Sequence, residues 1–463
     1  MISACNPMTP SSFRKLKTIM LTRLAFIIVL LLSVLPLWCQ VEPGAEGGVV
    51  NPDDADRMMV PPPVSGARYP TLTAAEEKSN FLGIAIVTGA AYNDNLVAGG
   101  GPATVSDEIY TVFPRITLDQ KTTRQHRSLS YSPGFMLYQN TTQLDDISQA
   151  ANVAWDIRLS PRVIVSVADG FAQNSNAFSQ PNMFQGGITA GPTGTLNAIV
   201  IEPFISQVTN NASAETTYQF GVNGMIGGSF STGFFHYPNL SQTPGLYNSH
   251  EEAASGFYSR RLTLSQYIGI TDEYDHILTS PVSTTTDTNA VNFFYTLFVR
   301  KEFNASIVAG PQFLNATAPG VPQSSSWEPA IAVSFGWQAR HANLTGSYSR
   351  TVTGGGGLLG AYTTNNGALA GRWVMAKTWN ATAAGTYYEI KGVSTQLPVT
   401  IPGGRTFMTG VTLEHTLSEH LVLDMEYQRL HQSYAGVAAI AGSPDSDQVS
   451  VSLIYQFNRP LGR

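Results

Sequence analysis

The feature that most constrains the fold of this chain is an alternation of apolar and polar residues with a period of two. It is clearest near the C-terminus, in the segment QVSVSLIYQF at residues 448–457. One parity of this segment is entirely apolar: Val449, Val451, Leu453, Tyr455 and Phe457. The other parity is polar except for Ile454. A period of two indicates a β-strand with one apolar and one polar face.

Similar stretches of about ten residues, the length of a membrane-crossing strand, recur from residue 80 to the end. Clear examples are 108–118, 152–160 and 328–340. They predict an all-β protein with about 18 strands (16–18), the first at 80–92 and the last at 447–458. An even number keeps both ends of the chain on the same side of a membrane.

The connections between the strands are expected to alternate between short and long. Short turns are predicted near residues 160, 222, 302, 340, 377 and 418. Long connections are predicted at about 93–105, 141–147, 174–213, 237–253, 277–289, 315–325, 353–363, 392–403 and 433–446. Short periplasmic turns alternating with long external loops are typical of a transmembrane antiparallel up-and-down β-barrel.

The low charge of the chain favours lipid as the environment of the apolar faces. Charged residues make up only 13% of the sequence, against about 25% in ordinary soluble domains. A soluble protein with 18 such strands would also need a core too large for one sandwich. Aromatic residues gather near predicted strand ends, as in interfacial girdles: Trp155, Tyr218, Trp337, Trp373, Trp379, Tyr455 and Phe457.

The N-terminal segment is interpreted as an export signal. Basic residues precede an apolar run at 24–37, which is short for a membrane anchor. We therefore expect a signal peptide at 1–40, a flexible Pro/Gly-rich periplasmic tail at 41–79 and the barrel at 80–463. Both cysteines, Cys5 and Cys39, fall within the signal, so no disulfide is expected in the barrel.

The alternating strand that ends at Phe457 resembles the terminal insertion signal of Gram-negative outer-membrane proteins, although six residues follow it. The region 80–463 resembles uncharacterised outer-membrane β-barrels of porin-like size. This resemblance implies a location in the bacterial outer membrane, with its lipids and the barrel-insertion machinery as partners. We expect residues 458–463 to be dispensable for insertion.

No residue pattern predicts catalysis, a cofactor or a metal site. His415 and His420 flank a turn with Glu414 and Glu419, which we interpret as surface residues. The segment 249–252, Ser-His-Glu-Glu, is expected in an external loop, and with Asp272 and Asp275 it shows no catalytic spacing. The chain is therefore predicted not to be an enzyme. Its acidic balance and lack of a basic patch argue against nucleic acid.

Several charges on the polar parity are predicted to line a pore: Arg115, Asp156, Arg158, Arg300, Glu328, Arg340, Arg372, Glu414, Asp424 and Glu426. They either pair across strands or set a field inside the barrel. The leading expectation is passive diffusion of small polar solutes. The alternatives are a conduit for polysaccharide secretion and a structural or surface-binding barrel. In the longest loop, the charge-poor segment 197–206 is predicted to fold into the lumen and narrow it.

Overall fold

The computed structural model describes residues 80–96, 104–174, 206–238, 240, 246–299, 302–319, 321–355, 358–393, 403–435 and 445–461. The predicted signal peptide and periplasmic tail, at 1–79, lie outside these residues. Of the segment 197–206, which is predicted to narrow the lumen, residues 197–205 also lie outside them.

The described chain consists almost entirely of strands, with one short 3-10 helix, η2 (Thr142–Leu144). The strands are β1 (Phe81–Asn93), β2 (Asp107–Lys121), β3 (Gln125–Tyr138), β4 (Asp146–Ser160), β5 (Val163–Asn174), β6 (Gln207–Phe220), β7 (Gly224–His236), β8 (Asn248–Thr263), β9 (Gln266–Ser280), β10 (Thr284–Val299), β11 (Phe303–Ala318), β12 (Val321–Gln338), β13 (Ala342–Gly355), β14 (Leu358–Ala376), β15 (Trp379–Gly392), β16 (Gly403–Ser418), β17 (Leu421–Ala435) and β18 (Asp445–Pro460). Within these residues, no helix is both long and apolar enough to span a membrane.

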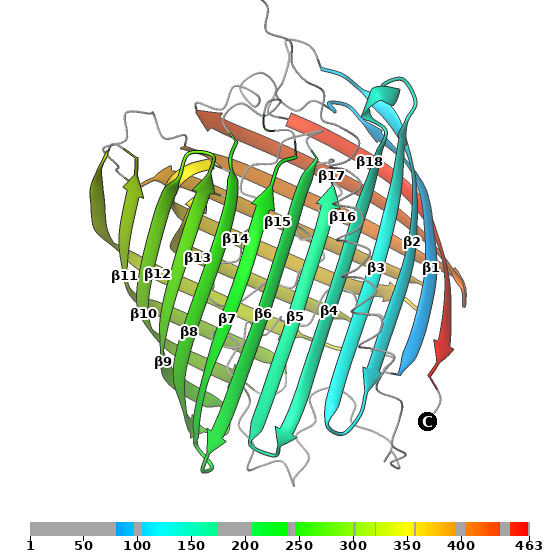
Figure 1. The fold of residues 1–463 in the computed structure, drawn as a ribbon. Helices are drawn as coiled ribbons and strands as arrows, with labels where there is room; N and C mark the ends of the chain where they lie inside the picture. The colour runs from blue at the N-terminus through cyan, green and yellow to red at the C-terminus, as the bar shows by residue number, and fades with distance from the viewer. Residues whose placement is uncertain are drawn as a thin grey trace, which may run out of the picture. The chain divides into compact units, whose positions relative to one another are not determined.

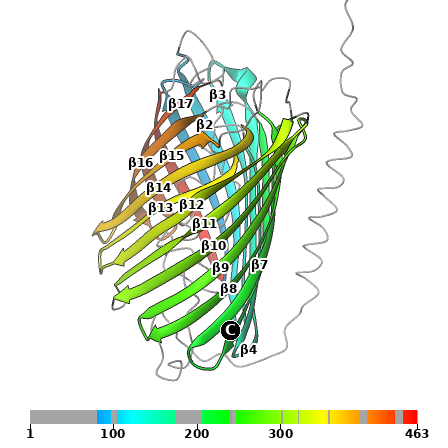
Figure 2. The ribbon, with the colours of Figure 1, turned by 90° about the vertical axis from the view of Figure 1, so that its left-hand side faces the viewer.

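The strands form one closed antiparallel sheet of 18 strands (Figures 1 and 2). Each strand pairs with its neighbours along the chain, and β18 pairs with β1 to close the ring. The closing register runs from Asn93↔Gln448 to Phe81↔Pro460. The predicted strand number and up-and-down topology are therefore confirmed.

The outer face of this barrel is apolar, as the alternation predicts. On β18 the five apolar residues Val449, Val451, Leu453, Tyr455 and Phe457 are exposed, and the residues between them are partly covered. The same face of the wall carries Ile84 and Ile86 on β1 and Val112 and Ile116 on β2. A closed barrel satisfies its backbone groups internally, so an apolar outer face can lie in lipid. The chain is an outer-membrane barrel.

The connections confirm the short-turn rhythm at one end of the barrel. At that end, every connection between successive strands contains two or three residues. We call the opposite end, where β1 leads into β2, the external end, following the predicted orientation.

Three long connections predicted at the external end are wrong. Residues 277–289, 315–325 and 353–363 lie mostly in strands, which leave only 281–283, 319–320 and 356–357 between them. These segments are rich in Thr, Ser, Asn and Gly, so they lack the apolar parity that identifies lipid-facing strands. Residues 248–252 likewise belong to β8 and not to a loop.

Candidate functional site

The interior face of the barrel is the candidate functional site. Of the ten charges predicted to line it, eight lie on the parity opposite the exposed apolar residues: Arg115 on β2, Asp156 and Arg158 on β4, Glu328 on β12, Arg372 on β14, Glu414 on β16, and Asp424 and Glu426 on β17. Arg340 instead lies in the turn after β12 and is exposed there. Arg300 lies outside the described residues.

One group of interior charges lies on β2, β3, β4 and β6. The His126 ring lies between two carboxylates, with nitrogen–oxygen distances of 3.0 Å to Asp119 and 3.7 Å to Asp156. Arg115 is exposed, and Glu215 on β6 lies close enough to Asp156 to experience its charge. Sequence reasoning missed His126, Asp119 and Glu215, although the parity of their strands could have identified them.

A second group lies on β16 and β17 and is acidic. Glu414 and Asp424 face each other in the register of these two strands, and Glu426 follows on the same face. Asn380 donates a hydrogen bond to Glu414 at 3.0 Å, and Gln428 donates one to Glu426 at 2.6 Å. No Lys, Arg or His of the described strands comes within 4.0 Å of these three carboxylates. Their negative charge is therefore not balanced by a basic neighbour among the described strands.

The interior is packed rather than open along β7 to β12. A buried apolar cluster on this part of the inner face comprises Met225, Phe257, Tyr267, Phe294, Val308 and Ala332. Three carboxylates on β8 and β9 are also buried, Glu251, Glu273 and Asp275. No group of three or more His, Cys, Asp or Glu residues in the described part of the chain is arranged to hold a metal ion.

The Ser, His and Asp residues that the sequence analysis considered for a catalytic set lie on different faces of the barrel wall. Ser249 and His250 are neighbours in β8, so their side chains project to opposite sides of the wall. Asp272 and Asp275 in β9 differ in parity in the same way. His415 stacks on Trp379 with ring centroids 4.1 Å apart, on the parity opposite Glu414.

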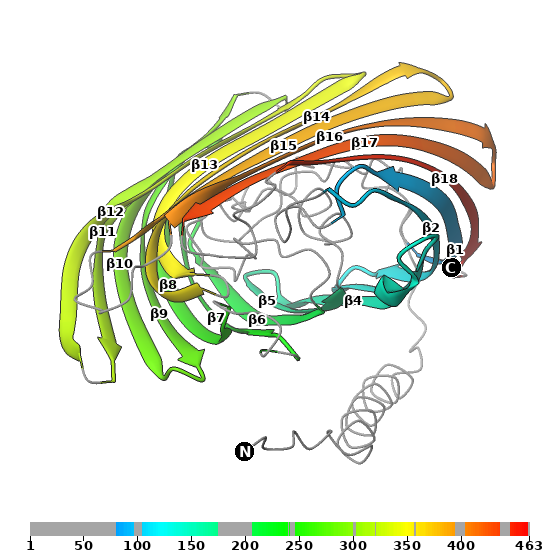
Figure 3. The same ribbon diagram turned by 90° about the horizontal axis from the view of Figure 1, so that it is seen from above.

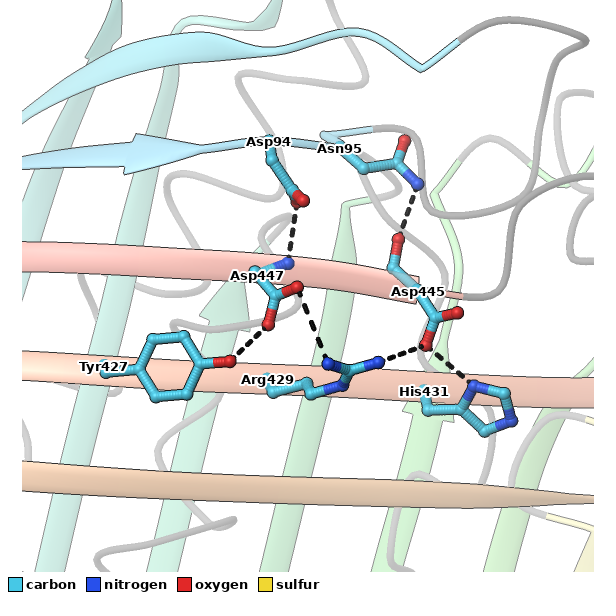
Figure 4. Close-up of polar contacts among 7 residues, drawn as sticks. All are labelled: Asp94, Asn95, Tyr427, Arg429, His431, Asp445 and Asp447. Carbon is cyan, nitrogen blue, oxygen red and sulfur yellow. Dashed lines mark hydrogen bonds and ion pairs between the residues drawn. The ribbon is translucent and has the colours of Figure 1, made fainter.

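A polar cluster also lies on the outer face, at the external end of β17 and β18 (Figure 4). Tyr427 donates a hydrogen bond to Asp447 at 2.6 Å, and Arg429 donates one to Asp445 at 3.3 Å. The hydrogen bond with His431 and the charge of Arg429 lower the pKa of Asp445 below its usual value. The cluster shares its parity with Val449, so it belongs to the outer rim and not to the interior.

No protein-family model and no curated protein matches this chain. Solved structures with a similar fold include OpdK of Pseudomonas aeruginosa with vanillate, at 9% identity and a TM-score of 0.38, covering 82% of this chain and 99% of that chain. OccAB4 of Acinetobacter baumannii has 8% identity, a TM-score of 0.39, and coverage of 84% and 100%. The ferric-catecholate import receptor Fiu of E. coli K12 has 8% identity, a TM-score of 0.40, and coverage of 82% and 82%.

Proposed function

We propose that this barrel is a channel for the passive diffusion of small polar solutes across the outer membrane. The observation that carries the proposal is the exposure of polar residues on the inner parity of three alternate strands. These residues are Arg115, Asn152, Asp156, Arg158, Asn211 and Ser213. Water at this wall solvates charges that would cost about 2–4 kcal/mol each on the lipid face at mid-depth.

The proposed path follows the inner face of β1 to β6 and the short-turn half of the inner face of β14 to β18, where Arg372, Glu414, Asp424 and Glu426 are partly exposed. The inner face of β7 to β12 and the external half of β14 to β17 are packed with buried side chains. A solute on this path meets the His126 group on one side and the Glu414, Asp424 and Glu426 group on the other. These groups interact with solutes by charge and hydrogen bonds, so the path suits hydrated polar molecules.

Single-channel recording of the purified protein in planar bilayers tests this function. We expect stepwise conductance, together with liposome swelling in small sugars. A folded barrel without conductance would support the structural or surface-binding alternative. Swelling that extends to long oligosaccharides without a size limit would support the polysaccharide conduit.

We also propose that the segment 197–206 narrows this path. Its sequence, NAIVIEPFIS, carries one charge and is otherwise mostly apolar. Burial of these apolar side chains against the inner wall is more favourable in free energy than their exposure to water. Replacing residues 198–204 with a Gly/Ser linker should raise the conductance and admit larger sugars. An unchanged conductance and size limit would refute the constriction without affecting the channel.

A further inference from the structure

The barrel wall splits between β12 and β13. Their register runs only from Gln338↔Asn343 to Ile331↔Arg350, although β12 continues to Val321 and β13 to Gly355. The pairing of β11 with β12, in contrast, continues to Val321. Between Val321 and Ala330, therefore, β12 is paired with β11 and, among the described residues, has no strand partner on its other side.

Proline chemistry explains where the pairing stops. Pro311 of β11 faces Pro329 of β12. Two prolines can face each other only at a non-hydrogen-bonded pair, where the nitrogens point away from each other. The Pro329 nitrogen therefore points towards β13 and has no hydrogen to donate. The β12–β13 ladder has to end before this residue, as proline at a strand edge requires.

Towards the external end of the split, β13 and β14 lie on the inner side of β11 and β12. Val352 shares its face of β13 with Tyr348, which is 46% exposed, yet Val352 is 3% exposed. Ala361 shares its face of β14 with Leu369, which is 52% exposed, yet Ala361 is 0% exposed. Both pack with Leu314 from the inner face of β11. β14 also contacts β10, and Figure 3 shows the yellow ends of β13 and β14 on the inner side of the green strands.

Side chains, and not a β-ladder, hold this overlap closed. The buried Gln312 amide of β11 donates to the Val352 carbonyl at 3.2 Å and accepts from the Val352 N–H at 2.9 Å. Arg350 and Glu328 form an ion pair at 3.5 Å across the split. The Gln312 hydrogen bonds and this partly exposed ion pair each contribute less than a continuous ladder of backbone bonds would.

We propose that the split between the upper halves of β12 and β13 is a lateral opening, with Gln312 as its latch. It would let small apolar or amphipathic molecules pass between the outer leaflet and the barrel interior. The layer behind the latch is apolar and consists of Leu314, Val352, Ala361 and Val393. On the outer face beside the split, Trp327 is 68% exposed and contacts Phe313. This lining favours apolar molecules and disfavours the hydrated solutes of the polar path.

Cysteine labelling tests the opening, because the only native cysteines are Cys5 and Cys39 and neither is in a barrel strand. With both changed to Ser, Ala361→Cys places a thiol between the two layers. We expect slow labelling by pyrene maleimide dissolved in the bilayer and none by a bulky water-soluble maleimide. Leu369→Cys, which lies on the same face outside the overlap, should label rapidly from the bilayer.

Two further variants should shift the labelling of Ala361→Cys in opposite directions. Gln312→Ala removes the latch and should speed labelling by about tenfold. Loss of a net stabilisation of the closed state equal to roughly one hydrogen bond raises the population of the open state by about that factor. Pro329→Val restores a backbone donor and should slow labelling by extending the β12–β13 ladder. Gln219→Ala, which removes a buried glutamine of β6 on the inner face, is the matched control and should change nothing.

Equal labelling rates in Gln312→Ala, Pro329→Val and the parent would overturn the lateral opening. So would labelling of Ala361→Cys by the water-soluble reagent alone, because it would mean access from the lumen. Heat-modifiability on gels verifies that each variant has folded. A folded parent that lacks conductance but shows the expected labelling shifts would count against the polar channel only, so the two proposals fail separately.

Discussion

Ser166 and Val167 are neighbours in β5 that project to opposite faces of the wall. Val167 is 43% exposed on the apolar outer face, whereas Ser166 lies between Asp156 and Glu215 in the register of β4, β5 and β6. Val167→Arg should destabilise the folded barrel, reducing its free energy of unfolding in bilayers by about 2–4 kcal/mol. Ser166→Arg should be neutral or stabilising, because its charge would meet two carboxylates. Urea unfolding in liposomes measures both, and equal losses would mean that the two faces are assigned wrongly.

Asp107 organises the external end of β2, outside the lipid-facing band. Burial acts to raise its pKa, but hydrogen bonds from the Thr141 side chain and from the backbone of Thr141, Asn140 and Glu108 outweigh it and lower the pKa to about 2. Its contribution to stability is therefore complete above its usual pKa of 3.8 and is lost as the pH falls towards 2.

Asp107→Asn should therefore destabilise the barrel at neutral pH by about 1.5–3 kcal/mol, the range for hydrogen bonds to a charged group. The difference between parent and variant should shrink as the pH is lowered from 4 towards 2. Urea unfolding at several pH values measures it. A difference that stays constant with pH would show that the ionised carboxylate is not what holds this end together.

Sequence parity predicts the face of a residue but not what covers that face. Ser334 has the inner parity, and parity alone suggests that it meets water, yet it is only 2% exposed. Val352 and Ala361 have the outer parity and are buried because β11 passes over them. Local alternation contains no information about strands that are distant in sequence, so these positions could not be predicted.

At the scale of the strand, the closing seam extends beyond Phe457. Asn458, Arg459 and Pro460 pair with β1, and the Leu461 N–H donates to the Asn80 carbonyl at 2.9 Å. Residues 458–460 are therefore part of the seam, whereas their dispensability for insertion stays a prediction. The alternation fades after Phe457 because these residues have no apolar parity.

Deleting residues 458–463 should lower the thermal stability of the folded barrel. The deletion removes three residues that pair with β1 and the backbone hydrogen bond from Leu461 to Asn80. Phe457→Ala keeps the seam and should mainly lower the yield of inserted protein, if Phe457 is the aromatic that the insertion machinery reads. Heat-modifiability on gels and membrane yield separate these two effects. A normal melting temperature after the deletion would contradict the role of the seam.

Across the whole molecule, the hairpin rhythm and the alternation are enough to predict a closed barrel of 18 strands. They also place eight of the ten candidate charges on the inner parity. What they do not show is that the interior differs from one side to the other. The cluster of Met225, Phe257, Tyr267, Phe294, Val308 and Ala332 forms only when six strands curve together, and no single strand contains that pattern.

This division of the interior determines the expected ion selectivity. Carboxylates outnumber basic groups along the proposed polar path, where Asp156, Glu215, Glu414, Asp424 and Glu426 face Arg115, Arg158 and Arg372. A solute crossing the path therefore meets a net negative field. Salt screens that field over about 10 Å at 0.1 M and about 3 Å at 1 M. We expect the channel to prefer cations, and to do so more strongly in dilute salt.

The reversal potential under a KCl gradient measures this preference. Changing Asp424→Asn together with Glu426→Gln should reduce it, since two of the three acids on β16 and β17 lose their charge. Asp447→Asn is the matched control, because Asp447 lies on the outer face of β18 with Tyr427 and Arg429. It should leave the reversal potential unchanged. Anion preference in the parent, or an equal effect of the outer-face variant, would show that these carboxylates do not face the permeating ions.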